Sequence, residues 1–146
     1  MDEIKAIRFS NNQIPELSFI FTPLISAPNV DFDISRLAWI DLSFNNISTI
    51  TIDFLDSVPN LCTLNIHANQ ISKLSDIKKL SSLKKLRSLT MCGNPVAEHK
   101  HYRNMIIFFC SENLVQLDFG CITNSERQKV AIWEQIYRKK LYPEDY

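Results

Sequence analysis

One phrase recurs four times along the chain and constrains its fold more than any other feature. Each copy reads Leu-x-x-Leu-x-Leu-x-x-Asn, with Ile, Phe or Met in place of Leu at some apolar positions. The copies end at Asn12, Asn45, Asn69 and Asn94, and these asparagines are 33, 24 and 25 residues apart. A unit of this size cannot bury its apolar side alone, so the copies are expected to stack into a solenoid.

The spacing within each copy predicts a short strand followed by a turn. In the second copy, Ile40 and Leu42 are two residues apart, so both point to the same side of a strand. We expect that side to be the interior. The asparagine follows at the turn, where its side chain can donate and accept hydrogen bonds from backbone groups. We therefore predict a structural column that binds no ligand, made of Asn12, Asn45, Asn69 and Asn94.

The expected fold is an α/β repeat solenoid of about four to five coils, with a parallel concave sheet and a helical C-terminal cap. We assign residues 1–146 to one domain. Residues 4–94 hold the repeats, with a longer insert at 18–36 that we interpret as a convex helix and a loop. Residues 95–146 form the last partial repeat and the cap, and Leu114–Phe119 is expected to be the final incomplete strand.

The two ends of the predicted solenoid differ. Thr123 and Glu126 have the spacing of a capping box, which predicts the start of a helix that covers the C-terminal end. Only three residues precede the first predicted strand, and an uncovered end exposes core and unpaired backbone groups. We hypothesise that a partner chain covers this edge, or that residues Leu17–Ile25 fold over it.

Composition argues against several classes of protein. Lys plus Arg and Asp plus Glu both number 16, so net charge supplies no attraction to nucleic acid or to an anionic membrane. No signal-peptide pattern opens the chain, and no apolar run approaches the roughly 20 residues that span a bilayer. We expect a soluble, cytoplasmic protein. None of the four cysteines forms a Cys-x-x-Cys pair, so we expect neither a metal nor a cofactor.

Strand positions that alternate with the core positions should form the concave face. Trp39 is notable there, because an outward-facing tryptophan is a typical interface anchor. The alternative is that Trp39 packs against its neighbours and serves stability only. Polar residues beside it would form the rim of an interface. The predicted partner-binding set is Arg8, Trp39, Asp41, Phe44, Asn65, His67 and Thr90.

Two other features leave alternatives open. Asp41 and His67 could meet on neighbouring coils, but Ser43 has no glycine context typical of a nucleophile, so we expect no enzyme. The run Lys73–Lys85 contains five lysines. It is either a patch for phosphate or acidic proteins, or simply a solvated face.

Several segments of the chain carry a resemblance to a known family: Leu37–Asn45, Leu86–Thr90, Gly93–Pro95, Tyr102, Arg103, Asp118, Phe119, Thr123 and Trp133. In these residues the chain resembles the short-repeat, Sds22-like class of the leucine-rich repeat family. The resemblance implies a non-enzymatic scaffold that binds protein partners, in a cytoskeletal assembly or the axoneme of a cilium or flagellum. It implies no direct contact with nucleic acid, membrane or small-molecule substrate. The alternatives are a regulatory subunit of a phosphatase or other enzyme, and a ribonucleoprotein component held by protein contacts.

Overall fold

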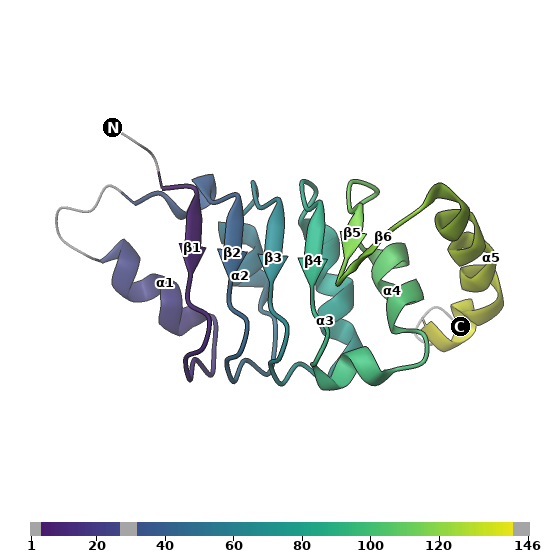
Figure 1. Cartoon of the computed structure of the whole chain (residues 1–146), viewed down its shortest axis with the longest axis horizontal. Coiled ribbons are helices and arrows are strands. Elements are labelled where there is room, and N and C mark those ends of the chain that lie inside the picture. Colours follow the sequence, from purple (N-terminus) through teal and green to yellow (C-terminus); the bar gives the residue numbers. More distant parts are fainter. Residues whose placement is uncertain (1–3, 27–31, 142–146) are drawn as a thin grey trace.

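The computed structural model describes residues 4–26 and 32–141. Its strands form one sheet in chain order, in which the first five run parallel and the last is antiparallel to its neighbour. Figure 1 shows the strands side by side in one layer, with helices behind them. The strands are β1 (Ala6–Arg8), β2 (Trp39–Asp41), β3 (Thr63–Asn65), β4 (Ser88–Thr90), β5 (Gln116–Leu117) and β6 (Gly120–Cys121).

The connections between strands carry short helices and 3-10 turns, and a longer helix closes the C-terminal end (Figure 1). The predicted α/β repeat solenoid with a parallel sheet and a helical cap is confirmed. Part of the predicted insert, 27–31, lies outside the described residues, as does 142–146 of the predicted cap. The helical elements are α1 (Ser18–Ile25), η1 (Ile34–Arg36), α2 (Ile52–Ser57), α3 (Leu74–Lys79), η2 (Leu80–Ser82), η3 (Pro95–Glu98), α4 (Tyr102–Phe109) and α5 (Asn124–Leu141).

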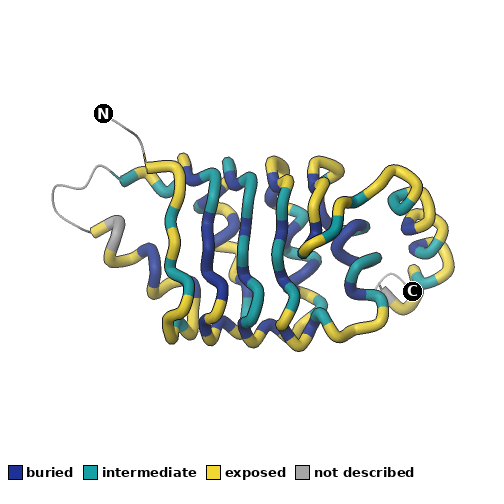
Figure 2. Tube along the Cα trace, viewed as in Figure 1, coloured by how far each residue is buried: buried dark blue, intermediate teal, exposed yellow. Residues whose placement is uncertain are grey.

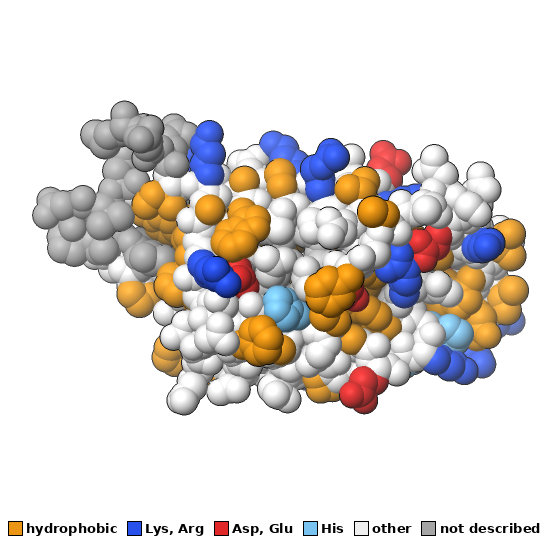
Figure 3. Space-filling model, viewed as in Figure 1, with side chains coloured by type: hydrophobic (Ala, Val, Ile, Leu, Met, Phe, Trp, Pro, Cys, Tyr) orange, Lys and Arg blue, Asp and Glu red, His pale blue; other side chains and the backbone are white. Residues whose placement is uncertain are grey.

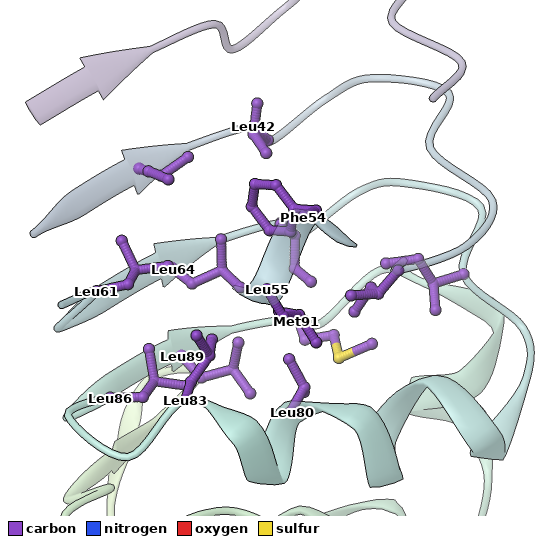
Figure 4. Packing of buried hydrophobic residues seen from close by; sticks show 14 of the residues in the cluster. Leu42, Phe54, Leu55, Leu61, Leu64, Leu80, Leu83, Leu86, Leu89 and Met91 are labelled. Carbon is purple, nitrogen blue, oxygen red and sulfur yellow. The ribbon is translucent and has the colours of Figure 1, made fainter. Parts of the chain in front are cut away.

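The core is a stack of equivalent apolar positions from successive coils. The strand register aligns their central residues in one row of Ile7, Ile40, Leu64, Leu89 and Leu117. Figure 4 shows that the middle of this row shares one interior with residues from the helical layer. Each such side chain contributes about 1.5–3 kcal/mol when it is buried. Figure 2 shows that burial is continuous through the coils of β2, β3 and β4 and weaker at β1.

A buried asparagine amide joins each pair of neighbouring coils from β1 to β4. Asn69 Nδ2 donates to the carbonyl of Leu42 in the preceding coil and to Ile66 in its own coil, both at 3.0 Å. Its Oδ1 accepts the backbone N–H of Ile47 at 3.0 Å. Asn45 and Asn94 make the equivalent bonds. Each amide therefore satisfies backbone groups that two adjacent turns would otherwise leave unpaired.

Asn12 does not make the buried hydrogen bonds of the other three asparagines in the predicted column. Its side chain is exposed, and Nδ2 donates only within its own turn, to the carbonyls of Phe9 and Ser10. The physical reason is position, because β1 is the outermost strand and no preceding coil among the described residues can supply a donor or acceptor. The column consists of three buried amides and one exposed end.

The helix α1 supplies apolar side chains to the N-terminal end. Leu17, Ile20 and Phe21 are buried, and the Phe21 ring stacks on Phe54 of α2 with centroids 5.4 Å apart. In Figure 1, α1 lies beside the first coil. The segment proposed to fold over this end thus packs against the core, whereas cover of the outer edge of β1 by a partner chain stays a prediction.

Arg103 fastens the C-terminal cap. It donates to both carboxylate oxygens of Glu126, from Nε at 2.6 Å and from Nη2 at 3.0 Å. The same guanidinium donates to the carbonyls of Leu117 and Cys121, so it ties α4 to α5 and to the β5–β6 hairpin. Thr123 Oγ1 accepts the Glu126 backbone N–H at 3.1 Å, which is the predicted cap of α5. The Arg103 hydrogen bond and charge hold the Glu126 pKa below its usual range, against the opposing effect of burial.

We expect Asn69→Ala to lower the free energy of unfolding by about 1–3 kcal/mol, because it removes hydrogen bonds from buried backbone groups of two coils. The matched control is Asn12→Ala, which removes the same amide from the exposed end and should change stability by no more than about 0.5 kcal/mol. Chemical denaturation of both variants measures the difference. Equal effects at the two positions would contradict the bridging role of the buried amides.

We expect Glu126→Gln to destabilise the protein by about 1 kcal/mol at pH 7, since it breaks a partly exposed, bidentate ion pair. A carboxylate whose folded pKa is lowered stabilises above its unfolded pKa, and this contribution is lost as pH falls through the folded pKa. The difference in the free energy of unfolding between wild type and variant should therefore become smaller from pH 7 towards pH 3. Denaturation across this range tests it, with the exposed Glu98→Gln as control. A gap that does not depend on pH would exclude the ion pair as its cause.

Candidate protein-interaction surface

The strand register builds the outer face of the sheet, here called the sheet face, from rows of equivalent side chains. One row contains Ala6, Trp39, Thr63, Ser88 and Gln116, and the next contains Arg8, Asp41, Asn65 and Thr90. Figure 3 shows this face as a largely uncharged surface on which hydrophobic side chains stand apart from one another, with a few charged groups between them. Such a surface suits a protein segment better than a polyanion.

Trp39 is half-buried at the start of β2 and lies outside the hydrophobic core cluster. Its neighbours in the same row are Ala6 on β1 and Thr63 on β3. Both side chains are much smaller than an indole. The geometry therefore places a large aromatic group above two small neighbours on the sheet face.

Asp41 differs from the expectation that it contacts a partner, because only 5% of it is exposed. Its Oδ1 accepts both the Ser43 hydroxyl at 2.6 Å and the Ser43 backbone N–H at 3.0 Å. Its Oδ2 is 3.2 Å from Arg8 Nε. The carboxylate is thus used to hold the turn and to orient the guanidinium. The Arg8 side chain, which is 70% exposed, is the group that a partner would meet.

Asn65 and Thr90 are both half-buried, and the Thr90 hydroxyl donates to Asn65 Oδ1 at 3.1 Å. Their side chains therefore pair with each other across β3 and β4. This pairing leaves the Asn65 amide group as the donor available to a partner.

The residue before each repeat asparagine adopts a left-handed conformation. The φ angles are 60° at Asn11, 55° at Phe44, 54° at Ala68 and 71° at Gly93. The left-handed region costs a residue with a Cβ atom roughly 1–2 kcal/mol, and only glycine adopts it freely. The sequence reasoning missed this column, although Gly93 immediately before Asn94 was the signal that could have revealed it.

Phe44 occupies this strained position and still exposes its ring. It is 53% exposed, and its ring meets the His67 imidazole edge-on with centroids 5.2 Å apart. A bulky aromatic residue at positive φ is a genuine outlier that the surrounding structure must over-determine. The fold thus holds Phe44 and His67 together at the end of the sheet face, as two neighbours in the predicted partner-binding set.

The most exposed large apolar residue of the described chain, Phe119 at 89%, was missed by the sequence reasoning. Leu114–Phe119 does not form one last strand, because β5 ends at Leu117 and a two-residue turn leads back into β6. Asp118 has a φ of 54° at the first position of this turn. The Asp-x-Gly sequence ending at Gly120 was the available signal for a turn.

Asp118 anchors the hairpin that presents Phe119. Its Oδ1 accepts the backbone N–H groups of Met91 at 2.8 Å and Cys92 at 2.9 Å, and its Oδ2 accepts the Tyr102 hydroxyl at 3.2 Å. Burial, together with the negative charge of Asp118, raises the pKa of both Tyr102 and Cys92. The hairpin is therefore held to β4 and α4, and Phe119 projects from a fixed support.

The polar side chains of Asp41 and Ser43, at the end of β2 and in the turn after it, are paired with each other. The Ser43 hydroxyl is committed to the Asp41 carboxylate, which leaves it oriented as a structural donor. Within 4–26 and 32–141, no three His, Cys, Asp or Glu side chains are grouped to hold a metal ion. In the same ranges, no helix has the length and apolar character needed to traverse a bilayer.

Several lysines of the run Lys73–Lys85 are used within the fold. Lys79 Nζ lies 2.6 Å from the buried Asp76 carboxylate, and Lys85 Nζ donates to Asn60 Oδ1 at 2.6 Å. Lys84 Nζ donates to a backbone carbonyl at 2.7 Å. These contacts favour the interpretation of the run as a solvated, internally paired face over that of an anion patch.

Comparison with known proteins agrees with this architecture. A family model described as leucine-rich repeat matches residues 1–141. Leucine-rich repeat-containing protein 51 of the rat is 34% identical over 126 residues, which cover 86% of this chain and 61% of that protein. The U2 small nuclear ribonucleoprotein A′ of Aspergillus fumigatus is 31% identical over 85% of this chain and 44% of its own length. The chain thus spans less than two thirds of these curated relatives.

Solved structures show the same fold. A chain in the crystal structure of the Drosophila melanogaster SNF/U2A′ complex superposes with a TM-score of 0.75 at 26% identity. The match covers 97% of this chain and 75% of that one. The Mex67:Mtr2 structure from Chaetomium superposes with a TM-score of 0.64 at 21% identity, over 88% of this chain and 91% of that one, which supports the fold alone.

Gly93 and Ala68 occupy equivalent left-handed positions, one before each repeat asparagine. We expect exchanges of glycine and alanine at these two positions to have opposite effects on stability. Gly93→Ala should lower the free energy of unfolding by about 1–2 kcal/mol, because the new Cβ adds left-handed strain and would lie 3.2 Å from the Ala68 backbone nitrogen. Ala68→Gly should raise it by about 0.5–1 kcal/mol through relief of the same strain. Denaturation midpoints measure both. Destabilisation by Ala68→Gly as large as that by Gly93→Ala would contradict the account.

Proposed function

Because the chain belongs to the leucine-rich repeat family, we propose that it is a non-enzymatic scaffold that binds a protein partner on the sheet face. The observation that carries this proposal is a set of three aromatic residues on the strands of this face and in the turns that follow them: Trp39 in β2, Phe44 after β2 and Phe119 between β5 and β6. Aromatic anchors of this kind supply most of the binding energy in protein interfaces. Two of the three, Phe44 and Phe119, are more than half exposed in the described structure.

The polar groups around these rings support a protein partner. The Arg8 guanidinium is held by Asp41 and Ser10 and remains largely exposed, and arginine is enriched at interfaces. The Asn65 amide lies beside Asp41 in one row of the sheet face, and the His67 imidazole lies beside the Phe44 ring. A partner segment that places apolar side chains on the rings and acceptors on Arg8 and Asn65 would match this surface.

For the assembly, we propose a cytoskeletal or ciliary complex, in which the chain acts in the cytoplasm or along the axoneme. The support is the resemblance to the short-repeat class, several members of which belong to cilia and flagella. The proposal concerns the described domain, since the curated relatives are longer than this chain.

A second candidate is a protein-bound component of a ribonucleoprotein particle. It is favoured by the superposition on the U2A′ chain of a complex with SNF, which extends over 97% of this chain. The neutral net charge argues that such a role would rest on protein contacts rather than on direct RNA binding.

The test is affinity purification of the tagged protein from its own cells, with quantitative mass spectrometry. We expect Trp39→Ala and Phe119→Ala each to weaken capture of the partner at least about tenfold, while the free energy of unfolding changes by less than about 1 kcal/mol. The matched control is Ile52→Ala on α2, which removes an exposed aliphatic side chain from the helical layer.

Loss of axonemal or cytoskeletal proteins in the two aromatic variants would support the first assembly. Loss of spliceosomal proteins would support the second, and a phosphatase catalytic subunit would overturn both. Retention of every partner by Phe119→Ala and Trp39→Ala, or loss with Ile52→Ala alone, would refute the sheet face as the binding surface.

A further inference from the structure

A hollow of ≈ 270 Å³ lies at the C-terminal end of the fold, away from the sheet face and outside the function proposed above. It is lined by Leu74 of α3, by the segment that leads into α4, by Met105 of α4 and by one side of α5. Figure 1 shows where these elements lie in the chain. The wall of the hollow is aromatic. The Trp133 and Tyr137 rings stack with centroids 5.5 Å apart, and His101 lies 4.7 Å from Tyr137 and 5.4 Å from Trp133.

The hydrogen bonds of the two histidines determine which nitrogen of each carries the proton. His101 Nδ1 accepts the Trp133 indole N–H at 3.2 Å, so the neutral imidazole carries its proton on Nε2. That Nε2 is buried and has no partner among the described residues. His99 Nδ1 accepts the His101 backbone N–H at 3.2 Å, which likewise leaves the proton on Nε2. The neutral form of each ring therefore carries its N–H at Nε2, and both residues line the hollow.

Cations complete the lining. Lys100 and Lys140 both line the hollow, and Lys140 Nζ lies 5.6 Å from the centre of the Tyr137 ring. No carboxylate is among its lining residues in the described chain. The pKa of His101 is lowered, first by burial and then by the neighbouring Lys100, His99 and Lys140. Among the described residues, the hollow therefore combines positive charge with an aromatic wall, and no carboxylate lines it.

We propose that this hollow binds an acidic side chain of a partner peptide, with an aromatic or apolar residue beside it. The carboxylate would accept from His99 and the lysines, and its neighbour would pack on Trp133 and Tyr137. The positive charges of Lys100 and Lys140 favour an anionic group in the hollow. The volume selects one or two side chains, because sites for drug-sized ligands are commonly larger, roughly 300–1,000 Å³.

The test uses the full-length, isotope-labelled protein and NMR titration with N-acetyl-Glu-Phe-amide. We expect the Trp133 indole N–H and the His101 ring signals to shift, while the Trp39 indole N–H stays unchanged. The bound carboxylate should raise the pKa of His101, because it offsets the surrounding positive charges. N-acetyl-Gln-Phe-amide has the same shape without the charge and should bind at least about threefold more weakly.

Two variants of α5 test the location. Lys140→Gln should weaken binding of the glutamate peptide at least about threefold, whereas Lys129→Gln, the same change outside the hollow, should leave it unchanged. Both retain the aromatic wall, and their folding is checked by the dispersion of the same spectra. Equal binding of the two peptides, or equal binding by the two variants, would overturn the proposal. Shifts produced by inorganic phosphate but not by the glutamate peptide would overturn the assignment to an acidic peptide.

Discussion

A buried asparagine amide that pairs with backbone groups of two coils is the interaction on which the rest of this structure depends. The strands β1 to β4 are only three residues long, so the sheet alone supplies few hydrogen bonds between coils. Asn45, Asn69 and Asn94 add bonds at each turn, where the backbone would otherwise bury unpaired groups. The amides thereby hold successive coils in one register, and equivalent side chains stand in straight rows on both sides of the sheet.

The same register creates the sheet face, which we propose as the binding surface. Inward rows form a continuous apolar core, and outward rows place Trp39 between small neighbours and Arg8 beside Asp41. The left-handed position before each asparagine is best filled by glycine, as at Gly93, yet the second coil carries Phe44 there. A fold selected only for stability would avoid this strain. The stacked coils offset the cost of this conformation, and the exposed Phe44 ring is one of the groups that we propose to bind a partner.

The C-terminal end of the solenoid serves two purposes. The Arg103 guanidinium donates hydrogen bonds to Glu126 and to the β5–β6 hairpin. These bonds hold the cap against the core and support the turn that carries Phe119. Trp133 of α5 packs partly against the core and partly lines the hollow beside His101. A cap that has to cover apolar residues can thus supply an aromatic wall for a ligand at the same time.

The repeat spacing by itself determined the solenoid, the parallel sheet, the inward rows and the helical cap, because a period of apolar residues around a fixed asparagine admits few other packings. Only the tertiary structure decided the fate of individual polar and aromatic groups. Asp41 has the residue type expected of a partner contact, but neighbouring coils bury it. Asn12 has the residue type expected in the column of buried asparagines, but it lies in the outermost coil and is exposed. Phe119 lies within an apolar string that reads as a strand, yet a turn at Asp118 reverses the chain and exposes it. The local sequence pattern specifies on which side of a strand a side chain lies. Its exposure and its hydrogen-bond partners depend on residues far away in the sequence, which only the folded chain brings beside it.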